Sequence, residues 1–507
     1  MTMADTFPAI SVQNEGPDPK RYWSLAVVAL AQLMIVLDAS VVIVALPSAQ
    51  RALHISVANR QWVMSSYTLA FGSLLLLGGR IADYLGRRRM FIVGLLGFGA
   101  ASALGGLAQN EAMLFGARAL QGAFAAVMAP AALSILTVTF TEARERARAF
   151  GVYGAIAGGG AAIGLVLGGT LTQLASWRWT LLINVPIAAM AAVAARRVVR
   201  ESRGESKASY DLPGAVTVTG GLFLLVYGFT MAGTHGWAAP ITVSLLAGSV
   251  LLLAVFAAIE LRSTHPLLPL RVVLDRNRGG SYLASLLVGS AMLGTFLFLT
   301  YYFQGTLHYS ALKTGFAFLP FSGGIIIGAG LASRLLPRSG PRALMMTGLA
   351  LAAGGLVWFT RLGIDSSYLG LVLPAEVMVS LGMGMAFVPM SSTALFGVEP
   401  KDAGVASALV NTTQQVGGSL GTALLNTLAA TAATTYLAAH AHVAGAVQSA
   451  AVHGYTTAFT VSAVLLAAAA VVAGVLIRAS RDQVQAEAAV VTVLPALEPE
   501  LDLESVG

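Results

Sequence analysis

The chain has 507 residues, of which 56% are hydrophobic and only 10% are charged, and its mean hydropathy is +0.77. Soluble domains carry about 25% charged residues, so this composition excludes a soluble globular protein and predicts an all-α polytopic membrane protein. The sequence contains no cysteine, which excludes disulfides and thiolate chemistry.

Apolar stretches recur along the chain, separated by short polar segments. A membrane-spanning helix needs about 17 to 25 apolar residues, and we predict fourteen such helices. In chain order they are Trp23–Pro47, Gln61–Gly78, Met90–Gln109, Met113–Thr137, Phe150–Leu174, Trp179–Ala195, Gly214–Met231, Ile241–Ile259, Tyr282–Phe303, Gly315–Leu336, Ala343–Phe359, Tyr368–Val388, Val405–Ala430 and Thr456–Ile477.

The connecting segments differ in their content of basic residues. When both termini are placed in the cytoplasm, the cytoplasmic segments hold 24 of the 30 lysines and arginines, the external segments hold five, and Arg118 lies inside a span. Membrane proteins show this excess on the cytoplasmic side. The net charge of +7 is thus explained by topology in a plasma membrane, and no nucleic-acid partner is expected.

The junction between the second and third spans reads GRIADYLGRRR and combines glycines, one acid and several arginines. The bilayer core has no water to satisfy loose polar groups, so this junction must lie at the membrane surface, and its arginines favour the cytoplasmic side. Glycines there permit a sharp turn and close packing of helices. We predict that the junction is a conformational gate formed by Gly79, Asp83, Gly86, Arg87 and Arg88.

A faint internal repeat divides the chain into halves. The loop after the tenth span contains GLASR, GPR and GL with glycine spacing similar to that of the loop after the second span. Two halves of six helices leave two helices as an insert. The predicted domains are an N-terminal six-helix bundle (1–205), a basic linker with two inserted helices (206–278), a C-terminal six-helix bundle (279–481) and a disordered cytosolic tail (482–507).

Two ionisable residues lie within spans of the N-terminal half, Asp38 in the first and Arg118 in the fourth. Charge inside a bilayer is costly, so each must be paired, protonated or in contact with water. We predict that Asp38 exchanges protons and that Arg118 biases its protonation; the alternative is a structural tie between helices. In the C-terminal half, Glu376 either receives protons or meets a cationic substrate, unless it lies at the external water line.

Polar and aromatic residues in other spans are candidates for lining a central substrate cavity. For any one of them the alternative is a hydrogen bond between helices. These candidates are Gln32, Tyr301, Gln304, Asn411, Gln414 and Gln415.

Several motifs together resemble one family. The first span contains LDASVVIVALP from Leu37 to Pro47, the fourth contains RALQG from Arg118 to Gly122, and the sixth begins with WRWTLLINVP. With the GRIADYLGRRR junction and NTTQQVGG at Asn411–Gly418, these strings resemble the drug:proton antiporter branch of the major facilitator superfamily, of the fourteen-helix QacA/EmrB type. This resemblance implies a major facilitator fold and a proton-transfer role for Arg118.

The fifth span resembles the antiporter motif of that family. Its glycines recur mostly at intervals of four, so they fall close to one helix face and let helices approach and slide. The sequence departs from the family at three positions: Ile43 replaces an asparagine, Tyr84 an arginine and Leu165 the motif's proline. The predicted packing glycines are Gly154, Gly158, Gly164, Gly168 and Gly169.

The energy source for transport can be inferred by excluding ATP hydrolysis. A nucleotide-binding P-loop needs Gly-Lys, and none of the four lysines follows a glycine. No catalytic set, metal site or cofactor is expected, so the protein is predicted not to be an enzyme. We predict a proton-coupled efflux transporter for amphipathic or cationic drugs and antibiotics, with drug, protons and lipid as partners. The alternatives are a proton-coupled transporter of a specific metabolite and a non-transporting membrane sensor.

Overall fold

A computed structural model describes residues 19–57, 59–140, 142–203, 211–263, 268, 270–398, 403–443 and 445–479. All regular structure in these residues is helical, which confirms the predicted all-α class. The predicted tail at 482–507 lies outside them. The helices are α1 (Arg21–Ala52), α2 (Trp62–Leu85), α3 (Arg87–Gly106), α4 (Glu111–Thr139), α5 (Ala143–Leu174), α6 (Trp179–Leu182), α7 (Asn184–Val198), α8 (Leu212–His235), α9 (Pro240–Arg262), α10 (Leu270–Val273), α11 (Arg276–Tyr301), η1 (Tyr302–Thr306), α12 (Ala311–Ala317), α13 (Leu319–Phe359), η2 (Tyr368–Val372), α14 (Leu373–Leu395), α15 (Ala403–Ala439) and α16 (Ala446–Leu476).

The predicted number of fourteen spans is not confirmed. Among the described residues, ten helices are long and apolar enough to cross a membrane, or 11 when α2, bent by 56°, is counted as one span. One reason is that α13, of 41 residues, is counted as one span although it covers the tenth and eleventh predicted spans as two limbs that meet at a kink. Gly340 kinks α13 between them, with a φ of 71° that glycine adopts at little cost.

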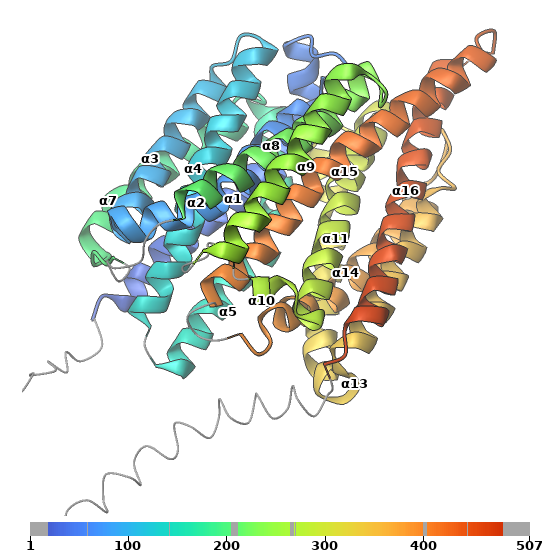
Figure 1. Ribbon diagram of the computed structural model, residues 1–507. Coiled ribbons are helices and arrows are strands. Elements are labelled where there is room, and N and C mark those ends of the chain that lie inside the picture. Colours follow the sequence, from blue (N-terminus) through green and yellow to red (C-terminus); the bar gives the residue numbers. More distant parts are fainter. Residues whose placement is uncertain are drawn as a thin grey trace, which may run out of the picture.

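The helices form two groups (Figure 1). In the first, α2 and α3 pack on α4, α1 packs on α5, and α3 packs on α7. In the second, α11 packs on α15 and α16, and α13 packs on α14 and α16. Helix α1 begins and α16 ends at the same end of the molecule, which is the lower end in Figure 1. This arrangement places Asp38 and Arg118 in the first group and Glu376 in the second.

The two groups meet along two flanks, α2 against α15 and α5 against α12. Helices α8 and α9 pack on each other, and α8 also packs on both α2 and α15. The Thr219 hydroxyl on α8 donates to the Ser73 carbonyl on α2 at 3.0 Å, and the rings of Tyr227 and Trp62 are 5.7 Å apart. Helix α8 therefore covers one of the two flanks.

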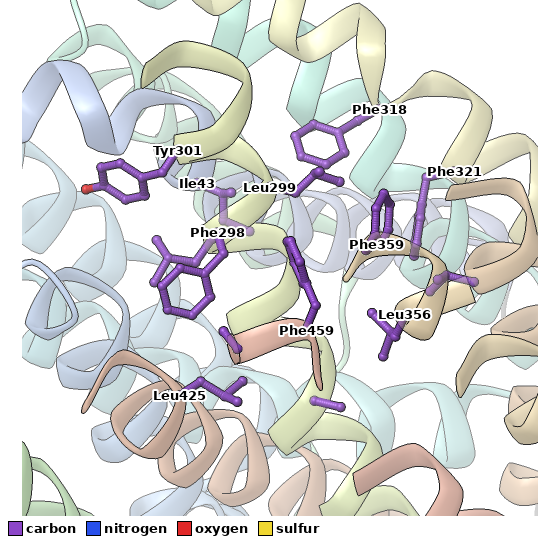
Figure 2. Close-up of a cluster of buried hydrophobic side chains, with 14 of the residues drawn as sticks. Ile43, Phe298, Leu299, Tyr301, Phe318, Phe321, Leu356, Phe359, Leu425 and Phe459 are labelled. Carbon is purple, nitrogen blue, oxygen red and sulfur yellow. The ribbon is translucent and has the colours of Figure 1, made fainter. Parts of the chain in front are cut away.

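A large apolar cluster surrounds α11 and reaches from α1 to α16. In Figure 2, Phe298 and Leu299 lie between Ile43 of α1 and Phe459 of α16, with Phe318, Phe321 and Phe359 beside them. Burial of aromatic side chains supplies large packing areas. The cluster thus makes the second group and the adjoining end of α1 one packed body.

Candidate functional site

Asp38 lies at the centre of the first helix group, and its side chain is fully buried. The carboxylate accepts three hydrogen bonds from side chains. Arg118 Nη1 donates to Oδ2 at 2.5 Å, while Gln121 Nε2 and Asn184 Nδ2 each donate to Oδ1 at 2.8 Å. Buried charges in proteins are normally paired in this way. The donors come from α4 and α7, so the carboxylate joins three helices.

Arg118 is equally buried and uses its guanidinium in several directions. Besides the bond to Asp38, Nε donates to the Val63 carbonyl of α2 at 3.0 Å, and Nη1 to Gln121 Oε1 at 3.0 Å. Its carbon Cζ lies 4.4 Å from the centroid of the Tyr67 ring, a cation–π contact. This planar fork explains why arginine rather than lysine fits the position.

Local sequence brings these groups together. Arg118 and Gln121 are three residues apart on α4 and so share one face. Gly122 packs against the backbone of α2 at Tyr67, where any side chain would collide, and this close approach brings the Val63 carbonyl within reach of Arg118.

Three side chains of the cluster are absent from the predicted site: Gln121, Asn184 and Ser102. Gln121 Nε2 donates to the Ser102 hydroxyl at 2.7 Å, and Asn184 approaches it at 3.4 Å. Asn184 belongs to the WRWTLLINVP string that resembles the family, so the sequence did contain a signal that this residue is functional. Nothing in the sequence around Ser102 distinguishes it from other serines in spans.

A void of about 10 Å³ adjoins Arg118 and is otherwise lined by Thr180 and mainly apolar residues of α1, α4 and α6. A space of this size holds about one water molecule. Arg118 Nη2 is buried and makes no hydrogen bond to the residues that the structure describes. The pair therefore has room for one further polar contact.

Glu376 lies in the first turn of α14 and is also fully buried. Neither of its carboxylate oxygens makes a hydrogen bond in the part of the chain that the structure describes. The neighbouring Tyr368 hydroxyl donates to the Ala317 carbonyl at 2.8 Å instead. The structure brings Asp38 and Arg118 together, but it places Glu376 in the other helix group.

The predicted gate loop turns at Gly86, whose φ of 110° favours glycine. Across this turn, Arg87 at the start of α3 pairs with Asp83 near the end of α2, Nε to Oδ1 at 2.8 Å. Gly79 lies beside Pro130 of α4, so a Cβ there would be 3.4 Å from its ring. These partners all belong to the first helix group.

Glu201, just beyond the end of α7, binds the part of the gate loop that follows Gly86. Its carboxylate accepts the backbone N–H groups of Arg88 at 3.0 Å and Arg89 at 3.2 Å, and lies 3.7 Å from Nε of Arg88. Sequence reasoning did not identify Glu201. In this conformation the loop is anchored to its own half.

The glycines of α5 allow close contact with helices of both groups. At Gly164 a Cβ would lie 2.7 Å from that of Ser40 on α1, and at Gly168 it would lie 2.8 Å from Cα of Val41. Gly169 lies against the α12 backbone at Ala311. Leu165, where the motif has proline, is buried, and Gly315 of α12 packs on its carbonyl. The surroundings of Gly154 and Gly158 lie outside what the structure describes.

The six predicted cavity residues divide into two sets. Gln32, Gln414 and Gln415 are half-buried and Asn411 is exposed. Tyr301 and Gln304 instead join the helix groups: the Tyr301 hydroxyl donates to Gln50, and Gln304 Nε2 donates to the Val44 carbonyl at 2.9 Å. Figure 2 shows the Tyr301 hydroxyl pointing away from the phenylalanines.

Arg60, which precedes α2, lies at the same contact between the groups and is only 7% exposed. Its Nε donates to Asn426 Oδ1 on α15 at 3.2 Å, and its Cζ lies 4.2 Å from the Tyr301 ring centroid and 5.8 Å from that of Phe298. The sequence analysis assigned Arg60 to an external loop. With Gln50, Val44 and Tyr301, Arg60 forms what we call the closure, at the end of the molecule opposite the gate loop.

Residues 28–422 match the Major Facilitator Superfamily, and the chain belongs to this family of membrane transporters. Its fold is similar to that of a bacterial homolog of the human lysosomal transporter Spinster, solved in an inward-facing and unoccupied conformation, with a TM-score of 0.65. The similarity covers 91% of this chain and 98% of that one at 16% sequence identity, which establishes likeness of fold alone.

Closer relatives are named for antibiotic resistance and export. The chain is 50% identical to the puromycin resistance protein pur8 of Streptomyces alboniger, over 96% of this chain and 97% of that protein. It is 42% identical to the cephamycin export protein CmcT of Amycolatopsis lactamdurans, over 80% and 84% respectively. Identity to the tetracenomycin C resistance and export protein of Streptomyces glaucescens is 35%, over 81% and 76%.

Proposed function

We propose that this protein is a proton-coupled exporter of antibiotics in the plasma membrane, of the drug:proton antiporter branch. The observation that carries the coupling is the Asp38–Arg118 pair, two opposite charges with fully buried side chains. The names of the relatives support the substrate class, since they include puromycin resistance and cephamycin export. Puromycin is therefore the first compound to test.

Protonation of Asp38 would change the packing of the first helix group. The neutral acid gives up its charge-assisted bond to Arg118, which is stronger than a neutral hydrogen bond. Arg118 keeps the Val63 carbonyl and Gln121, while the tie between α1 and α4 weakens. Glu376 is proposed as a second proton-binding group, because a fully buried carboxylate is costly to keep charged.

Transport would proceed by rocking of residues 1–205 against 279–481, with 206–278 as the insert. The bent α2, α5, α15 and the second limb of α13 would complete the fourteen spans. With both termini in the cytoplasm, the closure lies outside and the gate loop inside. The structure then corresponds to an inward-facing state held by Arg60, Tyr301 and Gln304.

The proposed function is tested by antibiotic susceptibility of cells with and without the gene. We expect the gene to raise the inhibitory concentration of puromycin, and a protonophore to abolish the drug extrusion. A panel with cephamycin, tetracenomycin C and lincomycin measures how wide the range of exported antibiotics is. Unchanged susceptibility to every compound would refute drug export, and drug accumulation above that of control cells would indicate uptake.

Replacement of Asp83 by asparagine is expected to slow turnover with little change in drug affinity. The Asp83–Arg87 pair is partly exposed, and exposed ion pairs contribute only about 0.2–1 kcal/mol, so the fold should persist. Its loss affects the gate loop and leaves the drug path intact. Drug binding and transport in proteoliposomes separate the two effects; reduced affinity at unchanged turnover would contradict a gate.

Replacement of Arg60 by alanine is expected to open the closure. It removes a hydrogen bond to Asn426 and the cation–π contact with Tyr301, so we expect a shift of about 10- to 100-fold toward the open conformation. Because the sequence lacks cysteine, spin labels at Leu174→Cys and Leu369→Cys can report the distance between the groups. Arg51→Ala is the control, since Arg51 bonds only within α1; an equal response to both changes would contradict the role of Arg60.

A further inference from the structure

A cavity of about 340 Å³ opens at the gate-loop end of the first helix group. It lies between the segment before α1, the start of α3 and the end of α7. Five of its lining residues are basic and one is acidic: Lys20, Arg88, Arg196, Arg197, Arg200 and Glu201.

The acid is already engaged, so the cavity retains an excess of positive charge. Glu201 accepts the backbone N–H groups of Arg88 and Arg89 and pairs with the Arg88 side chain. Arg196 and Arg197 lie in the last turn of α7, where cations complement the helix dipole. Lys20 and Arg88 reach the same helix end from two other segments, where Lys20 Nζ donates to the Arg197 carbonyl and Arg88 Nη1 to the Val199 carbonyl, each at 3.4 Å.

Aromatic side chains place this cavity at the level of lipid headgroups. Tyr22 and Trp23, directly after Lys20, are 56% and 68% exposed. Exposed tyrosine and tryptophan at the end of a membrane-spanning helix are typical of the membrane–water interface. Basic pockets at this level bind anionic headgroups through their phosphates.

We propose that the cavity binds the phosphate of an anionic phospholipid headgroup from the adjoining leaflet. The basic side chains suit this ligand because their positive charge attracts an anionic headgroup at the membrane surface. The bound lipid links the start of α1 to the end of α7 through opposite charge. This site is separate from the proton site and does not depend on the protein exporting a drug.

The test measures binding of phosphatidylglycerol to the full-length protein, as a saturable rise in melting temperature when the lipid is titrated into protein in neutral detergent. We expect the double variant Arg196→Gln/Arg197→Gln to bind about 20-fold more weakly, as two surface charges each contribute about fivefold. Arg196→Lys/Arg197→Lys keeps the charge and should retain most of the binding. Phosphatidylcholine and inorganic phosphate should leave the melting temperature unchanged.

Arg334→Gln/Arg338→Gln is the matched control, because both arginines are exposed on α13, in the other helix group. An equal loss of phosphatidylglycerol binding in this variant would show diffuse attraction and overturn the site. Equal stabilisation by inorganic phosphate would overturn the lipid as ligand, leaving a free-anion site. If the glutamine variant of the cavity does not fold, the lysine variant decides: loss of the lipid response despite retained charge contradicts the proposal.

Discussion

Replacing Asp38 with asparagine is expected to abolish antibiotic export driven by an imposed pH gradient. The amide is close to the carboxyl group in size but cannot exchange a proton in the transport cycle. Its carbonyl oxygen can still accept the bonds from Gln121 and Asn184, while its NH₂ faces the donor Nη1 of Arg118. Drug flux in proteoliposomes with an imposed gradient measures the effect.

The asparagine variant also leaves Arg118 as a buried charge without its counter-charge, which costs about 3–5 kcal/mol. The double variant Asp38→Asn/Arg118→Gln removes both charges and is expected to recover most of the lost melting temperature. Export should remain absent in the double variant. Recovery of gradient-driven export together with stability would remove Asp38 from coupling and leave it a structural role.

Replacing Arg118 with lysine is expected to reduce coupled transport by roughly 10- to 100-fold, because one ammonium group cannot replace the whole set of contacts. Arginine reaches Asp38, the Val63 carbonyl and the Tyr67 ring at once from a planar group. Lysine keeps the positive charge beside Asp38 but lacks the planar guanidinium group that makes several contacts at once. Proton release on drug addition, measured with drug flux, gives the coupling directly.

Arg118→Gln is the companion variant, measured for both melting temperature and drug-induced proton movement. If Arg118 only ties helices together, stability and activity should fall in parallel. If Arg118 instead biases the protonation of Asp38, the drug-induced proton movement should fall by more than the loss of stability accounts for. A stable glutamine variant with the parent's proton signal would contradict a coupling role.

Much of the fold was predictable because the bilayer constrains sequence strongly. Runs of apolar residues and the uneven distribution of arginines predict helices and their connections. The tenth and eleventh predicted spans correspond to two limbs of α13 that meet at Gly340, whose φ of 71° is not helical. The break depends on the backbone at one residue, which hydropathy does not register.

The candidate site was predictable only in part. Asp38 and Arg118 are identifiable because charges within spans are rare, and the structure pairs them. Asn184, Ser102 and Glu201 were missed, since neutral polar residues and loop acids are common and their partners lie far away in sequence. Arg60 was assigned to an external loop because its burial depends on α11 and α15 of the other helix group.

The position of α8 gives the two flanks of the transporter different lateral access. This helix covers the flank between α2 and α15, and α9 beyond it exposes Val250, Leu251 and Leu261 to the acyl chains. Among the described helices, none outside the two groups spans α5 and α12. A compound that diffuses laterally through the membrane therefore meets an additional helix at the first flank, whereas at the second it meets α5 and α12 themselves, which are packed directly on each other.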